Sequence, residues 1–142
     1  MYRYTDREPE VLLVHPGGPY WKNKNEGTWS IPKGEYNEDE EPLAAAKREF
    51  EEELGVPIIG KFIALKPVKQ NALKIVTAWA VEGDMDADNI ISNTIQTEWP
   101  PKSGKIIQIP EVDRACWFSI EEARKRLLPG QVGLLNQLEE LL

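Results

Sequence analysis

Three carboxylates lie close together near the end of one predicted helix. Glu49, Glu52 and Glu53 are spaced at i, i+3 and i+4, so at about 100° per residue they fall within an arc of roughly 100°. Like charges at this spacing destabilise an isolated helix by roughly 0.2–0.5 kcal/mol per pair. A bound divalent cation would remove the conflict, because hard cations such as Mg²⁺ take oxygen ligands. The spacing is compatible with a metal site, but for a run of glutamates taken alone a solvated acidic face is the commoner explanation, and it is our interpretation of Glu51.

The helix that must position these carboxylates is predicted from Leu43 to Leu54. Pro42 suits the first turn of a helix, where its missing N–H is not needed. Gly55 suits the position just past the end, where a left-handed conformation is common. The apolar stripe that predicts a buried face spans roughly 80° and consists of Leu43, Ala46, Phe50 and Leu54.

The segment Gly34 to Val56 is similar at every fixed position to the Nudix box, G-x5-E-x7-R-E-U-x-E-E-x-G-U, where U is a bulky apolar residue. That family hydrolyses diphosphate linkages in nucleoside diphosphates attached to other groups, using a divalent metal. The resemblance extends over nearly the whole chain. In particular, the chain looks like a bacterial Nudix subgroup described as predicted NTP pyrophosphohydrolases. Segments outside the box that carry it include 11–19, 29–35, 99–104 and 112–118.

The resemblance implies an α/β protein with the Nudix fold, an α/β/α sandwich around a mixed β-sheet. We expect a single Nudix hydrolase domain over residues 1–142, with the box at 34–56, since the length suits one domain. Nudix domains usually begin with a longer apolar strand, so the first strand is short here or the chain is truncated. The predicted strands are 1–4, 10–15, 28–31, 58–65, 72–81, 106–109 and 112–118, and the helices are 43–54, 119–128 and 132–142, with 90–105 irregular.

The resemblance also implies metal ligands, with Mg²⁺ or Mn²⁺ as the cofactor. Glu52 and Glu53 are the strongest candidates, and Glu49 is a ligand or a general base. The backbone carbonyl of Gly34 is a further candidate, since glycine allows the chain to approach a metal closely. The metal would neutralise phosphate charge and lower the pKa of the attacking water.

Other residues are expected to support or complete the site. Arg48 and Glu40 are assigned support roles, because the planar guanidinium suits the orientation of box carboxylates; an ordinary surface pair between Arg48 and Glu52 is the alternative. Many Nudix enzymes recruit a carboxylate from outside the box. Glu111 is our candidate and Glu98 the competitor, although either is equally explained as a solvated loop charge.

Substrate contacts are predicted on loops outside the helix. Lys33 precedes the box and is a candidate for a phosphate contact, with a solvated lysine as the alternative. Tyr20 and Trp21, and with them Trp29, are candidates for stacking a nucleobase, although aromatic residues usually serve the core. The single histidine, His15, is expected to be structural rather than to face the substrate.

Composition limits the classes of partner. With a net charge of −7 and no basic patch, the chain is not expected to bind duplex nucleic acid. It has no apolar run long enough for a membrane span and no apolar stretch of a signal peptide, so a cytoplasmic location is the default expectation. One cysteine excludes an internal disulfide framework. The expected partner is a small nucleotide, and the oligomeric state is left open between monomer and homodimer.

The expected function is therefore divalent-metal-dependent hydrolysis of a diphosphate linkage in a nucleoside triphosphate or related small nucleotide. An alternative is a dinucleoside polyphosphate (Ap4A-type) hydrolase, because the segment 31–35 resembles the entry to the box in those enzymes. A catalytically silent nucleotide-binding Nudix domain is a third hypothesis. Silent members generally lose box residues, and this chain keeps all of them, although a fold alone never proves activity.

Overall fold

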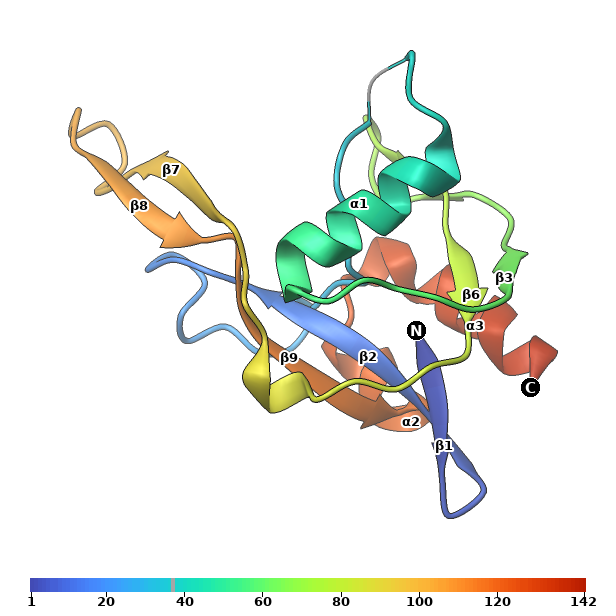
Figure 1. Ribbon diagram of the computed structural model, residues 1–142. Helices are drawn as coiled ribbons and strands as arrows, with labels where there is room; N and C mark the ends of the chain where they lie inside the picture. Colours follow the sequence, from blue (N-terminus) through green and yellow to red (C-terminus); the bar gives the residue numbers. More distant parts are fainter. Residues whose placement is uncertain (37) are drawn as a thin grey trace.

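The computed structural model describes residues 1–36 and 38–142, so position 37 of the box lies outside the described residues. Figure 1 shows helix α1 on one side of the central strands and helices α2 and α3 on the other. Among the described residues, no helix combines the length and the apolar character that crossing a bilayer requires. The elements are β1 (Tyr2–Thr5), β2 (Glu8–Pro16), α1 (Pro42–Leu54), β3 (Phe62–Ala64), β4 (Val68–Lys69), β5 (Ile75–Val76), β6 (Trp79–Val81), the 3₁₀ turn η1 (Ala87–Asn89), β7 (Thr94–Glu98), β8 (Ile106–Pro110), β9 (Val112–Ser119), α2 (Ile120–Arg126), the 3₁₀ turn η2 (Pro129–Gln131) and α3 (Val132–Leu141).

The central sheet is built on β2, which pairs antiparallel with β1 on one side and with β9 on the other. A single parallel bridge between Tyr2 and Glu82 joins β1 to the end of β6, where the Gly83 N–H donates to the Tyr2 carbonyl at 2.9 Å. β6 in turn pairs with β3. The bridge between β1 and the end of β6 therefore adds a parallel contact to strand pairs that are antiparallel, as expected for a mixed sheet.

Strand β2 is apolar on both faces, and this explains the two helical layers. Val11 and Leu13 pack in a core with residues of α2 and α3, whereas Leu12 and Val14 pack in a second core with Phe50 of α1. Successive side chains of a strand point to opposite faces, so a strand buried on both faces needs a layer on each. The expected α/β/α sandwich is confirmed.

Helix α1 ends at Leu54 as predicted and begins at Pro42, one residue before the predicted start. The Glu41 carboxylate accepts from the backbone N–H groups of Leu43 at 3.1 Å and Ala44 at 2.8 Å, which satisfies two donors that a helix start leaves free. Gly55 ends the helix with φ of 80°, a left-handed conformation, and its N–H donates to the Glu51 carbonyl. Both ends are thus defined, and the packing of Phe50 and Leu54 in the core accompanies the inward position of Glu49 and Glu53.

Several strand predictions were wrong in extent. Residues 28–31 form only isolated bridges, because their backbone is shared between Val14 and the end of α2. The predicted strand 58–65 shrinks to β3. The predicted strand 72–81 divides into β5 and β6, which pair with different partners.

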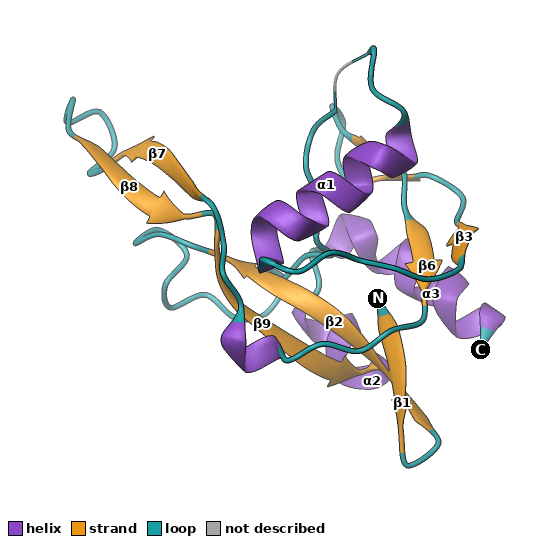
Figure 2. Cartoon of the chain, in the orientation of Figure 1, coloured by secondary structure: helices purple, strands orange, loops and turns teal. Residues whose placement is uncertain are grey.

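The segment 90–105 was predicted to be irregular and instead contains β7, which pairs with β8. Its β-branched residues Thr94, Ile95 and Thr97 favour a strand. The Trp99 N–H donates to the Lys105 carbonyl at 2.9 Å and closes the turn. Figure 2 shows that the resulting hairpin extends away from the sandwich, with its base beside the C-terminal end of α1.

Candidate metal and active site

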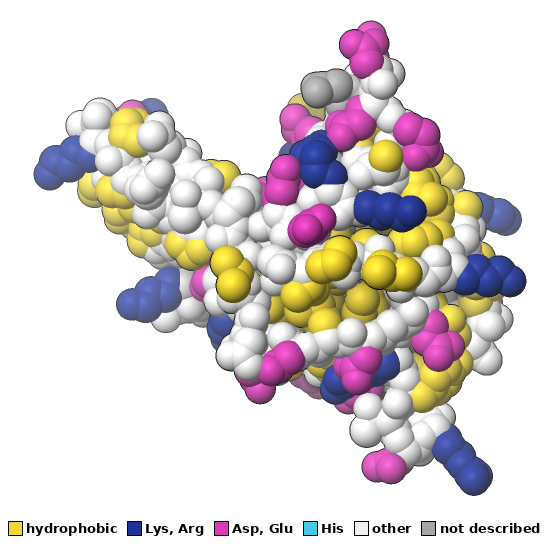
Figure 3. Space-filling model, in the orientation of Figure 1, with side chains coloured by type: hydrophobic (Ala, Val, Ile, Leu, Met, Phe, Trp, Pro, Cys, Tyr) yellow, Lys and Arg dark blue, Asp and Glu magenta, His cyan; other side chains and the backbone are white. Residues whose placement is uncertain are grey.

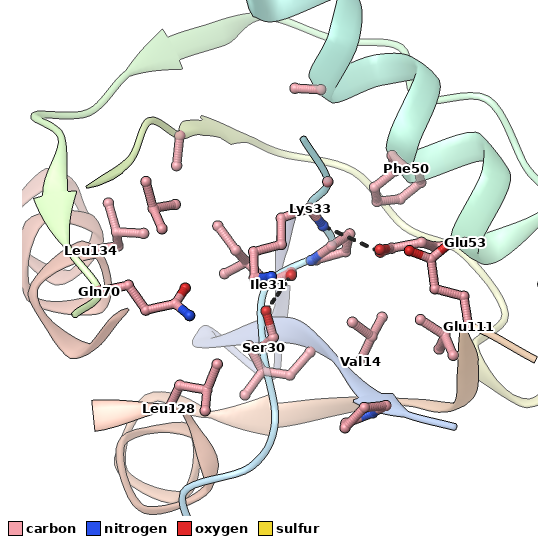
Figure 4. Close-up of a pocket in the computed structure, with 18 of the residues that line it drawn as sticks. Val14, Ser30, Ile31, Lys33, Phe50, Glu53, Gln70, Glu111, Leu128 and Leu134 are labelled. Atoms are coloured by element: carbon pink, nitrogen blue, oxygen red, sulfur yellow. Dashed lines mark hydrogen bonds between the residues drawn. The ribbon is translucent and has the colours of Figure 1, made fainter. Parts of the chain in front are cut away.

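Three carboxylates converge where α1 approaches the start of β9. One oxygen atom from each of Glu49, Glu53 and Glu111 lies within 4.8 Å of the other two. Glu49 is 8% exposed and Glu53 is 4% exposed. Figure 4 shows the side chains of Glu53 and Glu111 directed toward each other from α1 and from the chain before β9. We call Glu49, Glu53 and Glu111 the carboxylate cluster.

Backbone hydrogen bonds bring Glu111 to the helix. The Glu111 N–H donates to the Asn93 carbonyl at 2.9 Å, and the Asn93 N–H donates to the Glu52 carbonyl at 2.8 Å. The base of the β7–β8 hairpin is thereby tied to the last turn of α1. Glu98 lies elsewhere, because its carboxylate accepts from the Lys102 N–H at 2.6 Å within the turn of the hairpin. Of the two predicted candidates, the structure brings only Glu111 into the carboxylate cluster.

Burial and mutual repulsion disfavour the charged forms of these carboxylates. Burial raises the pKa of Glu53 to about 8, and the charge of Glu111 adds to the rise, while the Lys33 N–H, which donates to Glu53 Oε2 at 3.2 Å, opposes it. Burial also raises the pKa of Glu49, with Glu52 as the next cause. Buried acidic oxygens that repel one another are stabilised by a cation among them. The donor set, oxygen atoms alone, suits Mg²⁺ or Mn²⁺.

Gly34 leaves room for the carboxyl group of Glu49. A β-carbon at position 34 would lie 2.5 Å from Glu49 Oε1 and closer still to Cδ and Oε2. Any other residue would therefore displace the carboxylate. The structure gives this box glycine a steric role that the sequence did not show.

Arg48 holds three carboxylates at once. Its Nε and Nη2 donate to the two oxygens of Glu40 at 2.8 and 3.0 Å, and its Nη1 donates to Glu49 at 2.9 Å and to Glu52 at 3.2 Å. These contacts raise the pKa of Arg48, with the hydrogen bond to Glu40 as the largest cause. The planar guanidinium binds both oxygens of Glu40 and donates from its third nitrogen to Glu49. This contact orients the Glu49 carboxylate. The predicted contacts of Arg48 and Glu40 are present.

Glu52 lies outside the carboxylate cluster, although the helical spacing grouped it with Glu49 and Glu53. Its side chain is 41% exposed and accepts from Arg48 at the solvent edge of the site. At 100° per residue it is about 100° from Glu53, at the limit of the shared face. Glu51 is exposed, as expected for a solvated residue.

The predicted substrate residues Lys33, Tyr20 and Trp21 line one cavity of about 1070 Å³, together with Glu53 and Glu111. The Tyr20 and Trp21 rings meet edge to face at 4.7 Å, and the Lys24 ammonium lies 3.6 Å from the Tyr20 ring centroid. One face of Tyr20 is thus covered by a cation–π contact. A base stacked on that face would have to displace the Lys24 side chain.

Trp29 and His15 are structural. Trp29 is 3% exposed and packs against Phe118 and His15, so the interpretation of Trp29 as a stacking residue was wrong. His15 is fully buried, with Nδ1 2.9 Å from Asp113 Oδ1 and Nε2 2.6 Å from the Lys24 carbonyl. It anchors the loop that carries Tyr20 and Trp21 to the sheet, as the structural interpretation expected.

The surface around the site has an acidic region and an apolar region. Figure 3 shows acidic side chains gathered over α1 and the loop before it, and apolar side chains along the underside of the β7–β8 hairpin. In the hairpin, Ile95 pairs with Ile109 and Thr97 with Ile107. Ile95, Thr97, Trp99 and Ile109 also line the cavity. The hairpin, which the sequence did not reveal, therefore forms one wall of the site.

Several solved structures share this fold, and each of those named below aligns with 99% of this chain. They include a C. elegans Ap4A hydrolase in a binary complex (TM-score 0.59, 18% identity, 90% of that chain covered) and the NUDIX domain of Shewanella oneidensis NrtR complexed with ADP ribose (TM-score 0.61, 18% identity, 82% covered). The E. coli ORF135 protein has a TM-score of 0.56 at 22% identity, with 85% covered. At these identities the similarity establishes the fold.

A comparison with curated proteins found no match. The family model of the NUDIX domain, by contrast, matches residues 2–138, almost the whole chain. The matched region contains every fixed position of the box and the carboxylate cluster. The protein therefore belongs to the Nudix family and is a pyrophosphohydrolase of that family.

Proposed function

We propose that the protein hydrolyses a diphosphate linkage in a nucleoside triphosphate or a related small nucleotide, with Mg²⁺ or Mn²⁺ held by the carboxylate cluster. The observation that carries this proposal is the convergence of Glu49 and Glu53 from the box with Glu111 from outside it. The cluster opens into a cavity large enough for a nucleotide. Cytoplasmic location and a monomeric or homodimeric state belong to the same proposal.

The cluster fits a divalent metal in its chemistry and its setting. Its oxygens are close enough to share one ion, and their burial leaves negative charge that neighbouring protein groups only partly offset. The Gly34 carbonyl is proposed as a further ligand, and Glu52 as a ligand on the solvent side, next to Arg48. When bound, the metal supplies charge neutralisation for the diphosphate and lowers the pKa of the attacking water.

Other residues of the site have separate proposed roles in orienting a ligand, accepting a proton and contacting a phosphate. Arg48, anchored on Glu40, keeps Glu49 in one orientation. We propose that a cluster carboxylate that does not bind metal accepts the proton of the attacking water. Lys33 is proposed to contact a phosphate, since it lines the cavity beside Glu53.

The alternative substrate is a dinucleoside polyphosphate. The segment 31–35 resembles the entry to the box in such hydrolases, and one solved structure with this fold is an Ap4A hydrolase. Tyr20 and Trp21 at the edge of the cavity are proposed to contact the base in either case. A silent nucleotide-binding domain is disfavoured by the complete box.

A substrate panel tests the proposal. The purified protein is incubated with nucleoside triphosphates, diadenosine polyphosphates, ADP-ribose and nucleotide sugars, with Mg²⁺, Mn²⁺ or a chelator, and the products are resolved by chromatography. Metal-dependent cleavage between phosphates of a triphosphate is the expected result. Cleavage of the dinucleotides alone would select the alternative, and no cleavage of any compound with either metal would overturn the proposal.

A further inference from the structure

Two glutamine side chains form a hydrogen-bonded pair beside the part of the cavity that lies away from the carboxylate cluster. Gln131, in η2, is fully buried. Gln70 directly follows β4, and its side chain lines the cavity. Figure 4 shows Gln70 across the cavity from Glu53 and Glu111, with its amide directed inward.

The orientation of the Gln131 amide is fixed by a backbone group. The Ile31 N–H can only donate, and it donates to Gln131 Oε1 at 3.1 Å. Gln131 Nε2 therefore faces the other way, where it donates to Ser30 Oγ at 3.1 Å and to Gln70 Oε1 at 3.0 Å. Both hydrogens of Nε2 are used, and a flipped amide would set two donors against each other.

This arrangement determines which end of Gln70 faces the cavity. Its oxygen must accept from Gln131, so its Nε2 turns away with two hydrogens that have no partner among the described residues. The backbone is held too: the Gln70 N–H donates to the Lys74 carbonyl at 2.9 Å. A β-carbon on Gly130 would lie 2.6 Å from the carbonyl carbon of Gln70, so only glycine there permits this approach.

We propose that Gln70 contacts the base of the nucleotide as a hydrogen-bond donor alone and thereby selects bases with a carbonyl oxygen at their edge, such as guanine or hypoxanthine, over adenine. This inference rests on the proposed function and names its substrate class. A free glutamine amide pairs with adenine through both its nitrogen and its oxygen, at N7 and the 6-amino group. Here the Gln70 oxygen already accepts from Gln131, so it is not available to the base.

The remaining donors match a guanine edge, which presents two acceptors, O6 and N7. Adenine presents one acceptor at this edge, N7, next to its 6-amino group, which is a donor. The second hydrogen of the Gln70 amide would therefore face another donor. Ile31, Leu128 and Leu134 give this part of the cavity an apolar lining. The phosphates would then extend toward Glu53 and Glu111, across the cavity from Gln70.

The test compares GTP, ITP and ATP. We expect wild-type kcat/KM for GTP and ITP to exceed that for ATP by roughly five- to a hundredfold. Gln70→Glu should reverse the preference, because its cavity-facing oxygen accepts from an amino group, and Gln70→Met should abolish it. Gln96→Glu is the control, since it makes the same change of charge on the exposed outer face of the β7–β8 hairpin.

Equilibrium binding of the same nucleotides separates this inference from the proposed function. If none of the nucleotides is cleaved, the proposed function fails, and the affinities still report the base preference. Equal affinities for GTP and ATP, or a preference that persists in both Gln70 variants, would overturn the inference. Thermal melting confirms that each variant is folded, and if Gln70→Glu is not, Gln70→Met decides the outcome.

Discussion

The substitution Gly34→Ala is expected to disable the site by moving one carboxylate. The added β-carbon would lie 2.5 Å from Glu49 Oε1, whereas ordinary contact begins at 3.4 Å, so the Glu49 carboxyl group must move by about 0.9 Å or more. That movement would disturb the 2.9 Å contact with Arg48 Nη1 and the position of Glu49 relative to Glu53. A misplacement of about 1 Å can cost a hundredfold in rate.

We therefore expect kcat of Gly34→Ala to fall about a hundredfold with little loss of stability, because the displaced atoms are the end of a flexible side chain. The assay is steady-state hydrolysis of the best nucleotide, together with thermal melting at increasing Mn²⁺. Gly83→Ala is the matched control, because a β-carbon there meets only the flexible end of Met1, at 3.1 Å. A Gly34→Ala enzyme with wild-type kcat and the wild-type metal-induced shift in Tm would refute the steric role of this glycine.

Four further predictions test other parts of the site. Glu53→Gln should lower kcat at least about a hundredfold with the fold intact, since it removes metal-binding charge, whereas Glu51→Gln on the solvated face should be nearly neutral; equal losses in the two variants would contradict the assignment of faces. Arg48→Lys should lower kcat about tenfold or more, because an ammonium lacks the planar fork that holds Glu40 and Glu49 together; unchanged kcat would assign Arg48 to the surface. Because burial raises the pKa of Glu53 in the folded protein to about 8, above its ordinary value of 4.5, the metal-free protein should lose stability as pH rises between these values, and the increase in Tm on adding Mn²⁺ should grow with pH; melting curves from pH 5 to about 8.5 would show it, and a Tm gain independent of pH would count against it. Trp21→Ala should lower kcat/KM by roughly ten- to a hundredfold if the ring stacks the base, without changing metal-induced stabilisation; unaltered kinetics across the substrate panel would make Trp21 a packing residue.

The part of the site that the sequence predicted is the part that local chain chemistry determines. Pro42 and Gly55 define the ends of α1, and the 3.6-residue period turns Phe50 and Leu54 into the core. The same rotation carries Glu49 and Glu53 inward. The period alone did not resolve Glu52, because a residue at the limit of a helical face turns inward or outward according to what packs beside it.

The remainder depends on long-range contacts that no local pattern specifies. Glu111 reaches α1 only because the base of the β7–β8 hairpin is tied to the last turn of the helix through Asn93. The Gln131 and Gln70 side chains are 61 residues apart in the chain, and their pairing follows from the approach of η2 to the β4–β5 turn. Trp29 was a candidate for base stacking by its residue type, with a place in the core as the alternative, and its packing against Phe118 places it in the core.

The most direct test of the metal-dependent mechanism is the rate of nucleotide cleavage as a function of Mn²⁺ concentration, in the wild type and in Glu111→Gln. Glu111 lies outside the box, so its effect on metal dependence tests the assembled cluster rather than the sequence motif. We predict that the wild type is active only with metal, and that the variant is inactive or needs roughly ten- to a hundredfold more Mn²⁺. Cleavage that persists in a chelator, or identical metal dependence in the two proteins, would contradict the account.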